Sequence, residues 1–210
     1  MKIIKFIIIL FVSFKNFGQT KSVIFHNENG EQVTKEQFYK TKDNRKNLDL
    51  YFEKDSIQYG VLIKRQRFGQ LDKKTFRTLK NYVTELSDVT IDTTQNIVIN
   101  YLTANTKKID NKKSKSTWNV LDKNYLKKLH KIANINQFWI NSPECDNLNY
   151  YHQNKINWIT DNDDLFKKIF FPYQVKDANY ILIKPDGKFY YYIGEHSKYQ
   201  IWELSKKYFN

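Results

Sequence analysis

The chain has 210 residues, a formal net charge of +13 and an aromatic content of 16%. This length allows one or two small domains, and the many large aromatic side chains exclude an intrinsically disordered protein, because they supply enough apolar surface for a core. Only four of the 35 basic residues are arginines. Since the recognition of nucleic acids favours the forked guanidinium group, this lysine-dominated charge argues against a nucleic-acid partner.

The first segment of the chain has the pattern of a secretory signal peptide. Two lysines precede an apolar run at 6–12, and a small residue, Gly18, follows it. We expect residues 1–18 to be the signal, with cleavage near Gly18 or Gln19 and export to the periplasm or the medium. The alternative is a membrane anchor, but the apolar run is far shorter than the ~20 residues that span a bilayer. We therefore expect no transmembrane segment in the mature chain.

Residues 19–92 are expected to form a small α+β N-terminal unit. Two of its helix starts carry explicit signals: Thr34-x-x-Gln37 is a capping box, and Asp72 precedes apolar residues at helical spacing. Gly69 is expected to end the preceding β-ribbon. The expected elements are strands at 22–26, 48–53 and 57–67 and helices at 35–39 and 73–84.

A second pattern begins after residue 92, and residues 93–210 are expected to form an α/β domain. The β-branched run Ile97-Val98-Ile99 is typical of a strand that is buried on both faces. A strand, the turn Pro185-Asp-Gly187 and a second strand predict a β-hairpin. The expected strands are at 97–102, 135–140, 156–160, 180–183 and 189–193, and the expected helices are at 118–132, after Asp161 or Asn162, and after the capping box Ser197-x-x-Gln200.

This order of elements resembles the thioredoxin-like superfamily, and in particular its periplasmic TlpA/peroxiredoxin-like branch. The strand at 96–102 resembles the one that leads into the family's active-site loop, and Tyr180-Ile-Leu-Ile-Lys-Pro-Asp-Gly-Lys resembles the family's hairpin. Trp158, the acidic residues that follow it and the segment 170–175 resemble the region before the family's cis-proline. The resemblance implies a thioredoxin-like mixed sheet flanked by helices, preceded here by the small α+β unit.

The residues that carry the chemistry of that family are missing from this chain. No cysteine lies between Thr103 and Trp118, and no proline stands near Ala178-Asn179. The chain's single cysteine, Cys145, lies further along, and its two acidic neighbours disfavour the thiolate. We therefore expect a redox-inactive binding or interaction module without a cofactor. The alternative is a divergent thioredoxin-like enzyme, related to thiol oxidoreductases or peroxidases, in which Cys145 is a reactive thiol or the chemistry is unrecognised.

The densest positive cluster replaces the redox motif of the family. Its members are Lys107, Lys108, Lys112, Lys113 and Lys115. One interpretation is an anion-binding loop that makes weak contact with an anionic surface of the cell envelope. The other is a solvated lysine-rich loop without a ligand. The four histidines, His26, His130, His152 and His196, lack the spacing of a metal site, so no metal is expected.

Overall fold

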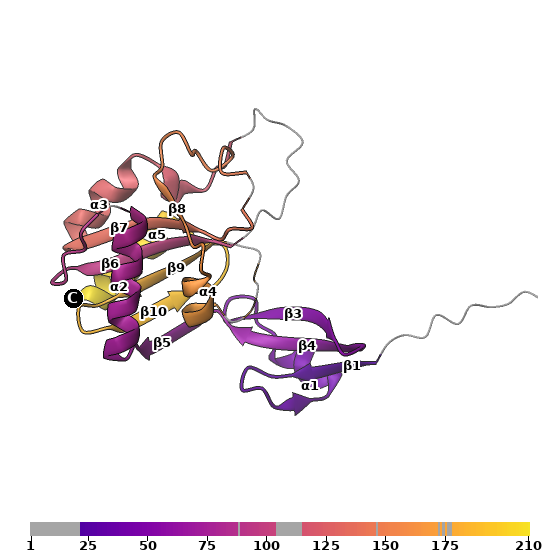
Figure 1. The fold of residues 1–210 in the computed structure, drawn as a ribbon. Coiled ribbons are helices and arrows are strands. Elements are labelled where there is room, and N and C mark those ends of the chain that lie inside the picture. Colours follow the sequence, from indigo (N-terminus) through magenta and orange to yellow (C-terminus); the bar gives the residue numbers. More distant parts are fainter. Residues whose placement is uncertain are drawn as a thin grey trace, which may run out of the picture. The chain divides into compact units, whose positions relative to one another are not determined.

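The computed structural model describes residues 22–87, 89–103, 115–145, 147–171, 173, 175 and 178–210. It is an α/β structure with mixed sheets flanked by helices (Figure 1). The chain divides into two compact units, which are described separately: the first holds residues up to Thr41 together with Asp49–Leu62, and the second holds Lys42–Leu48 and Ile63–Asn210. The expected signal peptide lies outside the described residues. Within them, no helix is long and apolar enough to cross a bilayer.

The first unit is a four-stranded sheet with one helix. β1 (Val23–His26) pairs antiparallel with β2 (Gln32–Val33) and parallel with β4 (Ile57–Lys64). β3 (Asn47–Lys54) lies on the other side of β4, which gives the order β2-β1-β4-β3. The helix is α1 (Lys35–Thr41), between β2 and β3 in the chain.

The start of α1 confirms the predicted capping box. The Gln37 amide donates to Thr34 Oγ1 at 3.2 Å, and the Thr34 amide donates to Gln37 Oε1 at 2.9 Å. These two bonds satisfy amide groups that a helix start otherwise leaves without partners. The helix buries Phe38 against Phe25, with 4.8 Å between the ring centroids, and against Leu62. This small cluster is the core of the first unit.

The second unit contains a six-stranded mixed sheet with the order β5-β10-β9-β6-β7-β8. Its strands are β5 (Gln66–Gln70), β6 (Asn96–Leu102), β7 (Ile135–Asn141), β8 (Trp158–Thr160), β9 (Ala178–Ile183) and β10 (Lys188–Tyr192). β6, β7 and β8 are parallel, whereas β9 runs antiparallel to both of its neighbours, β6 and β10. The predicted hairpin is confirmed, and Gly187 at its turn has a φ of +85°, which favours glycine.

Helices cover both faces of this sheet (Figure 1). They are α2 (Lys73–Ser87), the 3₁₀ turn η1 (Asn119–Leu121), α3 (Asn124–Ile132), α4 (Leu165–Phe170) and α5 (Lys198–Phe209). α3 and α5 pack against each other and bury Val98 and Leu182 of the sheet beneath Tyr125 and Ile201. On the opposite face, Tyr101 of β6 lies 6.0 Å from the ring of Phe166 in α4. Successive side chains of β6 point to opposite faces of the sheet, and since helices cover both faces, the whole apolar run of this strand is buried.

The residue at the N-cap position of α4 is Asp164 rather than the expected Asp161 or Asn162, but the buried carboxylate of Asp161 still binds the first amide groups of the helix. The Leu165 and Phe166 amides donate to the two Asp161 oxygens at 2.8 and 3.0 Å. The hydroxyl groups of Tyr82 and Tyr101 donate to the same carboxylate at 3.0 and 3.1 Å. This one side chain therefore joins α2, β6 and α4.

One predicted strand, 57–67, is divided in the structure. β4 ends at Lys64, and β5 begins at Gln66 and pairs with β10 of the six-stranded sheet. Arg65 stands at the break, where its guanidinium donates to the carbonyls of Asn44 at 2.7 Å and Ile193 at 3.0 Å. The second unit therefore includes β5 and α2, which precede the boundary expected between residues 92 and 93.

Gly69 lies inside β5 rather than ending a ribbon. It stands directly opposite Phe189 of β10. A Cβ atom at this position would lie 2.3 Å from Cζ of the Phe189 ring, so the ring occupies the space that any other side chain would need. The glycine is thus required by the close approach of an aromatic ring and not by a turn.

Candidate functional site: a basic groove between two helices

The family resemblance expects redox chemistry at the sheet edge after β6, of which the structure describes only part. Thr103, directly after β6, donates a side-chain hydrogen bond to the carbonyl of Val175. The cavity that the described residues leave here measures about 10 Å³, room for about one water molecule. Its lining includes Tyr101, Ser142 and Phe171.

Cys145 lies close to this edge, in the segment after β7. Its side chain is only 8% exposed, and the thiol donates to the carbonyl of Leu102 at 3.6 Å. The Cys145 amide is also bonded, to the Ser142 carbonyl at 3.0 Å. A thiol in this position is shielded from soluble disulfides and peroxides, because such reactions need an accessible thiolate.

The lysine cluster of the sequence analysis is only partly placed. Lys107, Lys108, Lys112 and Lys113 lie outside the described residues. Lys115 donates from Nζ to the carbonyl of Asn149 at 2.7 Å. In the described part of the chain, no group of three or more His, Cys, Asp or Glu side chains could hold a metal ion.

His196 is a buried histidine that lies among aromatic rings. Its Nδ1 lies 3.1 Å from the Gly194 carbonyl, and the rings of Trp118 and Tyr180 lie 5.2 and 4.7 Å from its own. Burial lowers its pKa to about 4, so the imidazole is neutral at physiological pH. It therefore serves as part of the core rather than as a charged binding group.

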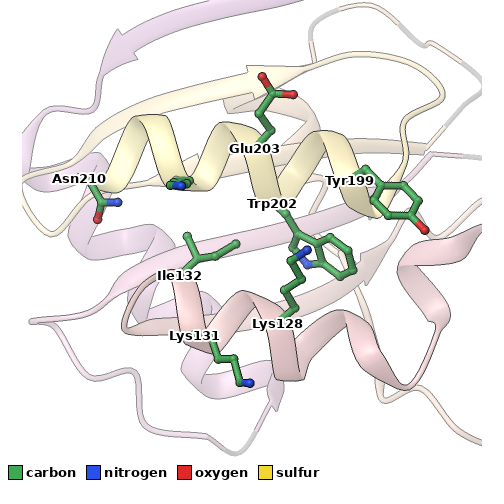
Figure 2. A pocket seen from close by; sticks show the side chains of 8 residues that line it. Lys128, Lys131, Ile132, Tyr199, Trp202, Glu203 and Asn210 are labelled. Carbon is green, nitrogen blue, oxygen red and sulfur yellow. The ribbon is translucent and has the colours of Figure 1, made fainter.

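The described chain does present an open groove elsewhere, between α3 and α5 (Figure 2). Its volume is about 520 Å³, and a second hollow of about 360 Å³ on the same two helices shares four of its lining residues. We call these two hollows together the basic groove. Its lining is Asn124, Lys127, Lys128, Lys131 and Ile132 of α3 with Tyr199, Trp202, Glu203, Lys206 and Asn210 at the C-terminal end of the chain.

The floor of the basic groove is apolar. Figure 2 shows Ile132 and Trp202 between the two helices. Trp202 is only 6% exposed, and its indole N–H donates to the Tyr125 carbonyl at 3.2 Å. Lys128 places its ammonium nitrogen 4.4 Å from the centroid of the Trp202 ring, and Tyr199 meets the same ring edge-on at 5.4 Å. Tyr199 itself is 63% exposed.

The walls of the groove carry excess positive charge. Its one acidic side chain, Glu203, forms an ion pair with Lys207 at 2.7 Å, and this partner lowers the pKa of the Glu203 carboxyl. Among the described residues, no carboxylate forms an ion pair with Lys127, Lys131 or Lys206. These three ammonium groups remain available to an anionic ligand.

A buried lysine holds the two helices together at one end of the groove. Lys198, the first residue of α5, bonds the Asp122 carboxylate at 2.6 Å and the Asn124 side chain at 2.9 Å. Its amide donates to the Asn119 side chain at 2.7 Å. Ser197 caps α5, as the second capping box predicts, by accepting from the Gln200 amide at 3.4 Å. The groove is therefore built on a fixed pair of helices.

Sequence reasoning missed this site and chose the lysines between residues 107 and 115. The lysines of α3 occupy the polar side of an amphipathic helix, which is the pattern of an ordinary solvated face. Their partner helix comes some seventy positions later, as the Lys198–Asn124 bond illustrates. The signal in the sequence was the recurrence of lysines on two amphipathic helices that flank the same core.

Comparison with models of known protein families finds no match, and comparison with curated protein sequences finds none either.

Proposed function

We propose that this chain is an exported, redox-inactive protein whose second unit is a thioredoxin-like binding module, and that the basic groove is its binding surface for an acidic ligand. The observation that carries the proposal is the set of three available lysines, Lys127, Lys131 and Lys206, above an apolar floor. Exposed lysines act as point charges, so they attract carboxylate and phosphate groups alike.

Several features support the individual parts of this proposal. The order β10-β9-β6-β7, with β9 antiparallel to the strands beside it, supports the thioredoxin-like assignment, as do helices in each of the expected connections. The buried thiol of Cys145 supports a redox-inactive role. Export rests on the charge and apolar pattern of the first eighteen residues.

The alternative is a divergent thioredoxin-like enzyme, which would use Cys145 or an unrecognised set of catalytic residues. The Cys145 thiol gives little support to such an enzyme, because it is only 8% exposed and is hydrogen-bonded to a carbonyl. The one cavity given for the described residues around Thr103 measures about 10 Å³, which is too small for a substrate.

The proposal is tested by chromatography on immobilised heparin, a generic polyanion. The groove variant replaces Lys127, Lys131 and Lys206 with glutamine. A charge-matched control replaces Lys73, Lys74 and Lys155, which are exposed and do not line the groove. We expect the groove variant to elute at clearly lower salt than the control, since site-specific binding depends on where the charges lie.

A third variant, with glutamine at Lys107, Lys108, Lys112, Lys113 and Lys115, tests the loop as a site of attachment to an anionic surface. If this variant alone loses retention on heparin and on anionic liposomes, the loop is the anion site and the groove is not. Equal elution of the groove variant and its control would refute the groove as the binding surface.

A further inference from the structure

We infer that the ligand of the basic groove is an acidic protein segment that carries an apolar anchor side chain. This inference rests on the proposed function and narrows it from any acidic ligand to one class. It follows from the groove's two-part surface, which pairs positive walls with an apolar floor.

The floor determines which polyanions fit well. The apolar surface that is still accessible between the helices comes from the half-buried Ile132 and from the aliphatic stems of Lys128 and Lys131, above the almost fully buried Trp202. A simple polyanion, such as a polyphosphate or a polyuronate, would neutralise the lysines but would leave this apolar surface without a partner. A peptide side chain such as leucine removes it from water and gains the corresponding hydrophobic free energy. The groove therefore favours a ligand with both kinds of group.

A sugar polymer is disfavoured for a second reason. Sugar rings commonly stack on the open face of an aromatic side chain, and Trp202 is the large ring of this groove. That ring is almost fully buried, with Lys128 over it at 4.4 Å, Lys198 at 5.5 Å and Tyr199 at its edge. Tyr199 is the exposed aromatic ring of this groove, but it lies at the margin, and one ring there is a poor stacking surface for a chain of sugars.

The dimensions of the groove suit a short segment of polypeptide. The nine residues of α3 extend over about 14 Å at 1.5 Å per residue. An extended peptide of about four residues covers the same distance, and its alternate side chains recur about every 7 Å. Lys127 and Lys131, one turn apart on α3, are separated by about 6 Å along the helix axis. Acidic side chains at alternate positions therefore match the spacing of the lysines.

The polarity of the helices indicates how such a segment lies. Lys198 and Asn124, the first residues of α5 and α3, bond each other at one end, and Asn210 and Ile132 lie at the other. Both helices thus begin at the same end, where their dipoles add positive charge, and both end where the carbonyl groups offset it. Because Lys131 and Lys206 lie near the carboxyl ends of the helices, acidic side chains of the ligand are expected on both sides of the anchor, opposite Lys127 at one end and opposite Lys131 and Lys206 at the other.

The test measures binding of labelled peptides to the full protein by fluorescence anisotropy at low and physiological salt. One peptide alternates glutamate and serine around a central leucine, and its partner has serine in place of that leucine. We expect the leucine peptide to bind about ten-fold more tightly, because the anchor buries apolar area. K127Q/K131Q/K206Q should weaken its binding by about ten-fold, and the control K73Q/K74Q/K155Q should leave it unchanged.

Alginate, a carboxylated polysaccharide, and polyglutamate serve as competitors that separate the outcomes. If both peptides bind equally, or if alginate displaces the leucine peptide more effectively than unlabelled peptide does, the inference is wrong while lysine-dependent anion binding still supports the proposed function. If no acidic probe binds in a way that depends on the groove lysines, both are wrong.

Discussion

Asp161 accepts four hydrogen bonds at the start of α4, and replacing it with alanine should strongly destabilise the second unit. The carboxylate is fully buried. Two of its donors are backbone amides of α4, at Leu165 and Phe166, so the substitution removes a helix cap worth about 1 kcal/mol. It also leaves the buried hydroxyl group of Tyr101 without its acceptor, at a cost of about 1–3 kcal/mol.

The expected total is about 3 kcal/mol of unfolding free energy, a large part of the 5–15 kcal/mol that is typical of a domain. Urea denaturation followed by tryptophan fluorescence measures it well, because all four tryptophans lie in the second unit. D161N, which keeps one acceptor oxygen, should lose less.

The Tyr101→Phe variant separates the two contributions. In the natural background it removes a hydrogen bond and should cost about 1 kcal/mol. In the D161A background it removes an unsatisfied hydroxyl group, so it should cost nothing or even stabilise the protein. If the two substitutions prove additive, the Tyr101 hydroxyl is not left without a partner and the reasoning fails.

Three further predictions concern the second unit. Replacing Gly69 with alanine forces the Phe189 ring to move and should cost about 1–3 kcal/mol in urea denaturation, whereas unchanged stability would show that the ring relaxes freely. Burial lowers the pKa of His196 from 6.5 to about 4, so between pH 4 and pH 6.5 the unfolded protein binds a proton at this residue that the folded protein does not. The contribution of His196 to the free energy of unfolding is therefore complete above pH 6.5, and up to about 3 kcal/mol of it is lost as the pH falls towards 4. H196N should show a correspondingly shallower loss of stability over this range, and a slope equal to that of the natural protein would contradict the assignment. Because Cys145 is buried, it should react with a soluble aromatic disulfide far more slowly in the native protein than in urea. The protein should also not accelerate the reduction of insulin by dithiothreitol. A fast reaction of native Cys145, or an acceleration of insulin reduction that depends on Cys145, would favour the oxidoreductase.

The parts of the fold that sequence reasoning predicted correctly are those with local causes. The capping box at Thr34 and the turn at Gly187 depend on residues a few positions away. The β-branched run in β6 was also informative, because burial on both faces leaves no polar position in the pattern.

The parts that it missed depend on residues far apart in the chain. The predicted strand 57–67 is broken at Arg65, whose guanidinium donates a hydrogen bond to the carbonyl of Ile193, 128 positions later in the chain. The helix predicted from Trp118 begins only at Asn124, after a 3₁₀ turn whose Asn119 accepts from the Lys198 amide. The apolar spacing runs through this break, so periodicity alone predicts one continuous helix.

The candidate site was missed for the same reason. Lys127, Lys131 and Lys206 have no distinctive sequence pattern of their own, and only the packing of α3 on α5 brings them to one groove. The lysines between residues 107 and 115 are more conspicuous because they are dense in the sequence. Density along the chain and proximity in the fold are different properties.

The pairing of β5 with β10 has a consequence for the way the protein folds during its synthesis. β5 leaves the ribosome early, whereas β10, the strand that bonds it, is among the last segments to emerge. Until then β5 has no strand beside it, and its backbone N–H and C=O groups lack their partners in β10. Long-range strand pairing of this kind is slow, and an early strand without its partner is prone to associate with other chains. Nascent chains that stop before β10 should therefore aggregate more readily than the finished protein.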